Sequence, residues 1–356
     1  MPRALAELGW EVEIIISFEM PRDLPLPFPE PFLAARDSRI SGANRIAWKD
    51  HQFPCWQIPG AMPTERGLVT FLQTVTRKKP LAILDIGGNG VAADLASQIT
   101  TTVALPLSAA PPIAETTFLA TVGREHETGL GPDPVREELD LDAGRFLPFR
   151  YAYRLPESGG TVPDALESIP ADRIRGVIVG NRLDKEISGA NLDLLVSCLE
   201  RVPQLHLVFV GPFQSFDMLA ARHPLLGVRA TALGLQNDVV AILRRCHLYL
   251  NPRRAGGGTS VAHALGCGLP VITFADGDGA YAAGPAFTVA GPEDYLARLA
   301  LWARDEAARR QAGAEAERRW AAISDRRASL AAFLDLLLAD DRLARPAPLF
   351  VRKRKR

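Results

Sequence analysis

From residue 173 to residue 274, short apolar segments rich in β-branched residues alternate with segments of helical periodicity. The expected strands are residues 174–179, 205–210, 228–233, 247–250 and 270–274, and the expected helices are residues 191–201, 216–222, 238–245 and 260–265. Alternation at this spacing predicts βαβ units and a parallel sheet. The strand segments are largely apolar, as expected where helices cover both faces of a sheet. This part of the chain therefore predicts a complete doubly wound α/β domain.

The first half shows the same alternation in a less regular form. Strands are expected at residues 11–17, 81–86 and 101–107, and helices at residues 4–8, 68–78 and 92–99. Because the chain begins inside a helix, we expect the first strand of this domain to be missing. Two Rossmann-like domains facing a cleft are thus predicted, in five segments. They are a truncated or divergent α/β domain (1–155), a Gly-, Pro- and Ser-containing linker (156–172), the second α/β domain (173–290), C-terminal helices (291–345) and a basic tail (346–356).

Charge and cysteine content exclude several classes of protein. Lys plus Arg and Asp plus Glu both number 41, and this neutral balance argues against a general nucleic-acid binder. Neither the four cysteines nor the histidines have metal-ligand spacing, so no metal site is expected. No apolar run reaches the roughly 20 residues of a membrane span, so we expect a cytoplasmic protein. The run Arg352–Arg356 predicts either a solvated tail or peripheral contact with the anionic inner face of a membrane.

A glycine-rich loop separates the expected strand 247–250 from the helix that follows. Gly256, Gly257 and Gly258 have no Cβ, so a ligand can approach their backbone closely. Thr259 and Ser260 come next and are good N-cap residues. The free N–H groups and positive dipole end of a helix suit a phosphate or diphosphate. The loop therefore predicts an anion site at the carboxyl end of a parallel strand.

Two cations follow the first strand of the same domain. Arg182 and Lys185 lie three residues apart at a connection between strand and helix, on the same expected sheet edge as the glycine loop. Such a pair would neutralise a diphosphate leaving group. Taken alone, the pair is more typical of ordinary surface residues.

Residues 173–284 resemble the nucleotide-sugar-binding C-terminal domain of GT-B glycosyltransferases, in particular family four, also called group 1. Four motifs of that family have counterparts here: a G-R-L-type turn with a nearby Lys, a strand ending in V-G, a G-x-x-x-D-V segment, and a glycine-rich loop with a helix and a G-L-P-V turn. In this sequence they are Gly180 with Arg182 and Lys185, Val210-Gly211, Gly234–Val239 and Gly256–Val271. The resemblance covers roughly a third of the chain closely and the first half only in outline.

The resemblance implies a GT-B fold and the transfer of a sugar from a nucleotide-diphosphate sugar to a glycan, lipid-linked glycan or polysaccharide acceptor, with no metal or other cofactor. It implies a role for Arg182 and Lys185 in catalysis at the diphosphate. The residues that it implies in donor binding are Gly257, Gly258, Thr259 and Ser260 at the diphosphate, Leu235, Gln236 and Asn237 beside the base, and His263 near the ribose. Apart from the resemblance, His126 is a candidate for a polar contact or a base lining the cleft between the domains, and a surface histidine is the alternative interpretation.

Two positions depart from the family pattern. Where the family has two glutamates eight positions apart, this chain has Ala255 and His263. An imidazole can bind ribose hydroxyls through one nitrogen, and the nearby helix N-terminus favours its neutral form. The departures leave open a non-catalytic relative that binds a nucleotide sugar or a partner.

A third hypothesis rests on the first half of the chain. Residues 84–93 read LDIGGNGVAA after an expected strand, as in dinucleotide-binding loops and in S-adenosylmethionine methyltransferases. Both kinds of site need an acidic residue at the end of the next strand to hold a ribose. No acid follows that strand before Glu115, so the fingerprint around Asp85 is incomplete, and a plain turn between strand and helix is the alternative.

Overall fold

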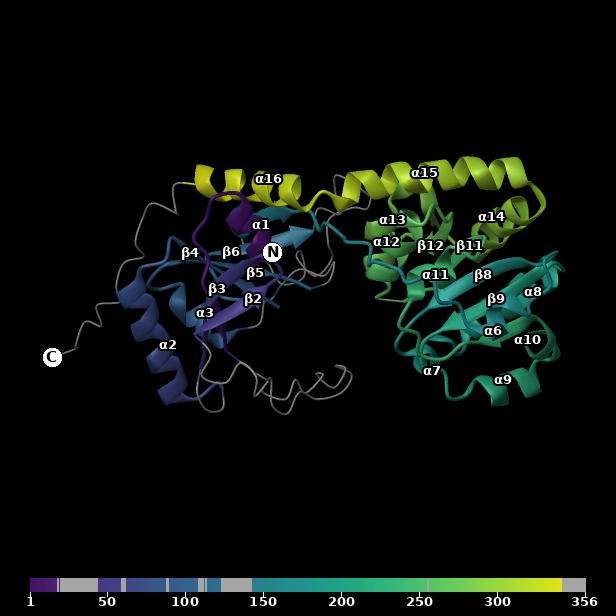
Figure 1. Cartoon of the computed structure of the whole chain (residues 1–356), viewed down its shortest axis with the longest axis horizontal. Coiled ribbons are helices and arrows are strands. Elements are labelled where there is room, and N and C mark those ends of the chain that lie inside the picture. Colours follow the sequence, from purple (N-terminus) through teal and green to yellow (C-terminus); the bar gives the residue numbers. More distant parts are fainter. Residues whose placement is uncertain are drawn as a thin grey trace. The chain divides into compact units, whose positions relative to one another are not determined.

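The computed structural model describes residues 1–17, 19, 44–58, 62–87, 90–107, 112, 114–122, 143–254 and 256–340. The chain divides into two compact units (Figure 1). The described residues of the first unit lie within 1–122, 143–150 and 326–340, and those of the second unit are residues 151–254 and 256–325. No helix of the described chain is both long enough and apolar enough to cross a membrane.

A six-stranded parallel sheet forms the centre of the second unit, in the order β10-β9-β8-β11-β12-β13. Its strands are β8 (Ile174–Val179), β9 (Leu205–Val210), β10 (Ala230–Ala232), β11 (Leu248–Asn251), β12 (Val271–Phe274) and β13 (Thr288–Val289). Every residue of β9, β11 and β12 is buried, which explains why these strands are largely apolar. The predicted doubly wound domain is confirmed.

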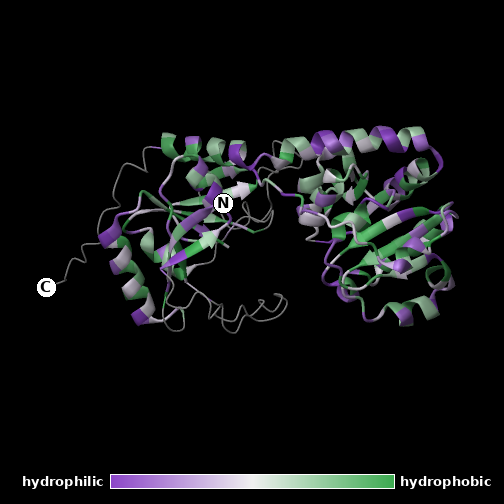
Figure 2. Ribbon diagram, viewed as in Figure 1, coloured by the Kyte–Doolittle hydropathy of each residue, from purple (hydrophilic) through white to green (hydrophobic). Residues whose placement is uncertain are grey.

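Helices cover both faces of this sheet. They are α6 (Asp164–Glu167), α7 (Leu183–Glu186), α8 (Ala190–Arg201), α9 (Phe216–Arg222), α10 (Pro224–Arg229), α11 (Val239–Leu243), α12 (Gly258–Gly266), α13 (Gly277–Ala283), α14 (Pro292–Arg304) and α15 (Glu306–Ser324), with a 3₁₀ turn at Pro285–Phe287. One group of contacting helices contains α8, α10 and α14, and another contains α11, α12 and α13. Helix α15 packs on α12 and α13, and Figure 2 shows a mixture of hydrophilic and hydrophobic residues along it.

One expected strand is shorter than its sequence pattern. A strand was expected over residues 228–233, but β10 begins only at Ala230 because α10 continues through Arg229. Pro224 is the first residue of that helix, where the fixed φ of proline favours helix initiation.

The first unit contains two smaller sheets. A parallel sheet has the order β4-β5-β6-β7, with β4 (Ala82–Ile86), β5 (Thr101–Leu105), β6 (Phe118–Val122) and β7 (Phe146–Phe149). In the other sheet, β3 (His51–Gln57) lies between β1 (Ile14–Ile16), to which it is parallel, and β2 (Arg45–Trp48), to which it is antiparallel. The helices of this unit are α1 (Pro2–Glu7), α2 (Glu65–Lys78), α3 (Val91–Ala96) and α16 (Arg326–Ala339), with a 3₁₀ turn at Ala143–Arg145.

The last helix belongs to the first unit. Helix α16 packs on β7, where the rings of Phe149 and Phe333 meet edge to face at 5.2 Å. The hydroxyl of Ser329 also donates to the carbonyl of Arg150. The expected segment of C-terminal helices, residues 291–345, thus supplies α14 and α15 to the second unit and α16 to the first.

A buried histidine at the amino end of the second sheet gives a test of this packing. His206 in β9 is 8% exposed, and its Nε2 lies 2.9 Å from Thr231 Oγ1. Burial, aided by Arg173, Arg175 and Arg229, lowers the pKa of His206 to about 4. In the unfolded chain its pKa returns to about 6.5, so the unfolded state binds the proton more tightly.

The neutral His206 therefore contributes stability above pH 6.5 that is lost as the pH falls from 6.5 to 4. We expect this loss to amount to roughly 3 kcal/mol, at 1.36 kcal/mol for each pKa unit. Calorimetric melting of the wild type and of His206→Gln at pH 7 and pH 4.5 measures it, because the Gln side chain cannot titrate. Equal losses of melting temperature in the two proteins would contradict this assignment.

Candidate functional site

The candidate site lies where the strand order of the second sheet reverses. Strands β8 and β11 are adjacent and parallel at the centre of the sheet, and their connections run to opposite edges. Open α/β sheets bind ligands at the carboxyl ends of such strands, because the diverging loops leave room there. The loop after β8 carries Arg182, and the loop after β11 carries the three glycines. Both predicted motifs are therefore at the topological switch point.

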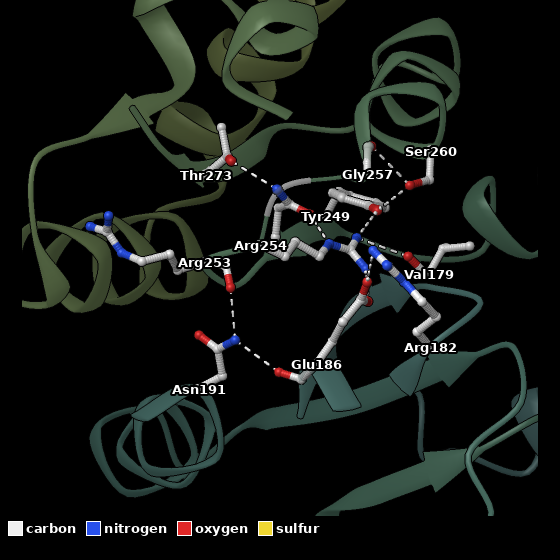
Figure 3. A network of polar contacts seen from close by, with 11 residues as sticks. Val179, Arg182, Glu186, Asn191, Tyr249, Arg253, Arg254, Gly257, Ser260 and Thr273 are labelled. Atoms are coloured by element: carbon white, nitrogen blue, oxygen red, sulfur yellow. Dashed lines mark hydrogen bonds and ion pairs between the residues drawn. The ribbon is translucent and has the colours of Figure 1, made fainter. Parts of the chain in front are cut away.

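Arg182 lies beside the glycine loop (Figure 3). It precedes α7 as its N-cap residue, and its side chain is 49% exposed. Its Nη2 is 3.4 Å from Glu186 Oε1, and a Cβ placed on Gly256 would lie 3.9 Å from the same nitrogen. A half-exposed guanidinium thus faces bare backbone.

Lys185 is placed differently from Arg182. It lies in the four-residue helix α7 and is exposed. In the described part of the chain, its ammonium group has no ion-pair partner, and no contact joins it to the glycine loop. The geometry thus brings Arg182, but not Lys185, to the glycines.

Two of the three glycines are required by protein packing. Gly257 has a φ of +94°, and a Cβ there would come within 2.9 Å of Arg254 Nε. A Cβ on Gly258 would come within 2.9 Å of the carbonyl oxygen of Asp278 in α13. Among the described residues other than its chain neighbours, the atom nearest to a Cβ placed on Gly256 is Nη2 of Arg182. Two residues of the loop are therefore glycine because Arg254 and α13 pack directly against its backbone. The sequence analysis did not identify this reason.

Helix α12 begins earlier than expected. Gly257 is its N-cap and Gly258 its first residue, so Thr259 and Ser260 are inside the helix and cap nothing with their side chains. The Ser260 hydroxyl donates to the carbonyl of Gly257 at 3.0 Å and accepts from the Tyr249 hydroxyl at 2.8 Å. It is therefore occupied within the protein, whereas Thr259 is exposed. The N–H groups of the first helical turn have no intrahelical partners and remain the anion-binding feature of α12.

His263 follows on the same helix, one turn after Ser260. Its Nε2 lies 3.1 Å from the carbonyl oxygen of Arg154, which can only accept, so Nε2 carries the hydrogen. Burial lowers the pKa of His263, although this hydrogen bond opposes the change. The neutral ring then leaves Nδ1 as an acceptor, the role that a carboxylate oxygen would have.

The segment expected beside a base is the loop after β10. Leu235 is 74% exposed and Asn237 is exposed, while the Gln236 amide donates to the carbonyl of Leu233. The next residue, Asp238, accepts from Ala241 N at 2.9 Å and thereby caps α11. It also accepts from Ser158 and Gly160 in the expected linker, so this loop is tied to that segment.

Sequence reasoning missed a buried polar group beneath both loops. Arg254 is 4% exposed and bonds to Glu186, Tyr249 and Asn251 (Figure 3). The sequence did carry one signal, an arginine between an apolar strand and a run of glycines. A buried arginine would require neighbours without side chains, whereas an arginine at the surface would not.

The Asp85 loop uses its carboxylate internally. Asp85 accepts from Gly90 N at 3.1 Å, and burial raises its pKa despite this bond. The described part of the loop and the wholly buried, uncharged strand β5 supply no acid for a ribose. These contacts favour a plain turn between strand and helix.

Some predicted residues lie outside the described chain, namely His126, Ala255, Gly88 and the basic tail. Within the described ranges, no three His, Cys, Asp or Glu side chains are grouped so that they could hold a metal ion.

Comparisons with known proteins bear on the family and the fold. Residues 174–301 match the family model described as glycosyl transferases group 1. No curated protein has significant sequence similarity to the chain. A glycosyltransferase from Rickettsia africae ESF-5 aligns over 81% of this chain and 86% of its own, with a TM-score of 0.57 and 10% identity.

Two further structures show the same fold. The lipopolysaccharide outer core galactosyltransferase WaaB aligns over 80% of this chain and 85% of its own, with a TM-score of 0.53 and 13% identity. A point mutant of S. aureus TarM, whose structure contains UDP, aligns over 76% of this chain with a TM-score of 0.53 and 9% identity, and the alignment spans 58% of TarM. The chain therefore has the fold of GT-B glycosyltransferases, and residues 174–301 are a domain of the group 1 family.

Proposed function

We propose that the second unit binds a nucleotide-diphosphate sugar at the switch point and that the chain transfers the sugar to an acceptor. The observation that supports this proposal most directly is the Arg182 guanidinium beside Gly256, where two parallel strands diverge. A diphosphate at the N-terminus of α12 would meet free N–H groups and a positive dipole end on one side and Arg182 on the other.

In the proposed reaction, charge develops on the diphosphate as the glycosidic bond breaks. Arg182 and the N–H groups of Gly257, Gly258, Thr259 and Ser260 would stabilise that charge, with the exposed Lys185 as a second cation. A single well-placed donor of this kind contributes about 3–4 kcal/mol. Since these groups supply the neutralisation, we expect turnover to be unaffected by EDTA.

The remaining donor contacts follow from the same placement. The loop of Leu235, Gln236 and Asn237 would flank the base, and His263 Nδ1 would accept a ribose hydroxyl. UDP is the first nucleotide to test, because TarM was crystallised with it. We propose that the first unit binds the acceptor, a glycan, lipid-linked glycan or polysaccharide, and that the basic tail 346–356 adds contact with an anionic membrane surface.

A non-catalytic nucleotide-sugar binder is the second candidate. It is favoured by Ala255 and His263, which replace two carboxylates of the family. Binding without release of nucleoside diphosphate would support it over transfer.

Ligand-induced stabilisation tests both candidates. A ligand present at about 100 times its Kd adds roughly 2.7 kcal/mol to stability, which is readily seen as a higher melting temperature. We expect UDP-, GDP- or ADP-sugars to raise the melting temperature, and NAD and S-adenosylmethionine to leave it unchanged. A shift with S-adenosylmethionine alone would overturn the proposal in favour of the Asp85 loop.

His263 gives a test at the ribose. A glutamine at this position can donate to the Arg154 carbonyl and still accept a hydroxyl, whereas a glutamate cannot donate. We therefore expect His263→Gln to keep the donor KM within about threefold and His263→Glu to raise it about tenfold, as for one lost hydrogen bond. A lower KM in His263→Glu would contradict the tautomer assigned above.

A further inference from the structure

The Arg254 guanidinium connects the two loops of the candidate site. It donates to the carbonyl of Val179 at the end of β8 (2.8 Å) and to Glu186 Oε2 in α7 (2.7 Å). On the β11 side, it donates to Asn251 Oδ1 (2.8 Å) and to the Tyr249 hydroxyl (3.1 Å). One buried, planar group thus spans both sides of the switch point (Figure 3).

Glycines in both loops pack directly against this guanidinium. A Cβ on Gly180 would come within 2.8 Å of Arg254 Nη1 and of Glu186 Oε2. A Cβ on Gly257 would come within 2.9 Å of Arg254 Nε. The arginine and the two glycines are therefore a fitted set, and neither loop can move away without breaking hydrogen bonds of a buried cation.

The network also reaches the first turn of α12. Arg254 donates to the Tyr249 hydroxyl, which donates to Ser260, which in turn donates to the Gly257 carbonyl. Tyr249 is fully buried, so this relay has little freedom. It holds the helix end whose free N–H groups the proposed function uses.

Two arginines share one carboxylate in this network. Glu186 is 11% exposed, 2.7 Å from Arg254 and 3.4 Å from Arg182. Because the shorter and better buried pair neutralises Glu186, the half-exposed Arg182 can turn to a ligand without leaving an uncompensated carboxylate. Without Arg254, Glu186 would hold Arg182 and place a negative charge beside the diphosphate.

We infer that Arg254 is a positioning residue: it locks the loops after β8 and β11 into one anion-binding surface and, by neutralising Glu186, releases Arg182 for the diphosphate. The inference rests on the proposed function for its ligand, but the lock itself is a property of the ligand-free chain. Arg254 is buried beneath both glycines and is not expected to touch the donor.

The test uses the full chain with Arg254→Met, the double variant Arg254→Met/Glu186→Gln, and Arg253→Met as the matched control. Arg253 is the adjacent arginine, 56% exposed and paired with Asp276 at the surface. Calorimetric titration with inorganic pyrophosphate and with UDP measures binding. Hydrogen exchange by mass spectrometry of the ligand-free chain follows both loops.

We expect Arg254→Met to weaken pyrophosphate binding about 10–100-fold, the range for a binding group displaced by about 1 Å. Adding Glu186→Gln should recover about tenfold, because the uncompensated carboxylate is removed. A merely structural arginine would instead make the double variant no better than the single one. Both loops should exchange faster in Arg254→Met, and Arg253→Met should match the wild type.

Wild-type affinity and unchanged exchange in a folded Arg254→Met would overturn the inference, as would a double variant without recovery. If Arg254→Met does not fold, Arg254→Lys takes its place, because lysine keeps the positive charge but cannot make all the hydrogen bonds of the planar guanidinium. Wild-type affinity and wild-type exchange in Arg254→Lys would also overturn the inference. Should the wild type bind neither UDP nor pyrophosphate, the proposed function fails and the release of Arg182 with it. Hydrogen exchange of the two loops in Arg254→Met would then still test whether Arg254 holds the loops after β8 and β11 together.

Discussion

Replacing Arg182 with alanine is expected to reduce kcat/KM for the nucleotide-sugar donor about 100–1000-fold. The reason is that its guanidinium is a solvent-accessible cation placed against the glycine loop. Loss of a preorganised donor to developing charge costs about 3–4 kcal/mol of transition-state stabilisation. Release of nucleoside diphosphate measures the rate without knowledge of the acceptor.

The matched control is Arg201→Ala, which removes an exposed arginine from the last turn of α8. Both variants should melt within about 2 °C of the wild type, since exposed substitutions change stability by about 0.5 kcal/mol or less. Lys185→Ala tests the second cation and should have the smaller effect, because no contact within the described chain fixes that side chain near the loop. Donor kinetics within twofold of the wild type in Arg182→Ala would remove Arg182 from the site.

Central strands of the second unit were predictable because β9, β11 and β12 are completely buried and β8 is buried over its middle residues. The segments Ile174–Val179 and Leu205–Val210 were expected with the bounds that the structure has, since short, largely apolar runs are typical of covered parallel strands. Short helices were harder to place. The α10–β10 boundary depends on Pro224 initiating a helix, against the β-branched pattern of the residues that follow.

The hairpin of β2 and β3 in the first unit was not predicted. Strand β3 contains Pro54, and proline normally argues against a strand interior because it cannot donate a ladder hydrogen bond. Here Pro54 pairs only with Arg45 of β2, because the pairing with β1 begins one residue later, at Cys55. A register of this kind depends on the neighbouring strands and cannot be read from one segment.

For the site, sequence identified the loops but not what holds them. Arg182 and the glycines each follow a parallel strand, so they meet at the carboxyl edge of the sheet where the strand order reverses, as in other open α/β sheets. The reasons for Gly257 and Gly258 lie in the side chain of Arg254 and the backbone of Asp278, which only the folded chain brings near. Side-chain partners across the sheet have no sequence period, so a buried network of this kind is visible only in three dimensions.

The loops after β8 and β9 approach each other closely, so Gly211→Ala is the substitution that we expect to destabilise the second unit most. Gly211 follows β9 with a φ of +126°, and a Cβ there would overlap the carbonyl oxygen of Gly180. Gly180 N donates to the carbonyl of Val210, and Gly211 N donates to that of Gly234, so both backbones are fixed. Neither can yield without lost hydrogen bonds.

We expect Gly211→Ala to cost about 4 kcal/mol or more, in the range of severe backbone and packing defects. At about 2–4 °C for each kcal/mol, the calorimetric transition of the second unit should fall by about 8–16 °C. Gly234→Ala is the control, because Gly234 also has a positive φ, +67°, but no atom within 4 Å of its added Cβ among the described residues. It should cost only about 1–2 kcal/mol of dihedral strain. Equal shifts of melting temperature in the two variants would mean that the loops after β8 and β9 are not in contact. The Gly180–Arg182 segment would then lack the packing support that the proposed donor site requires.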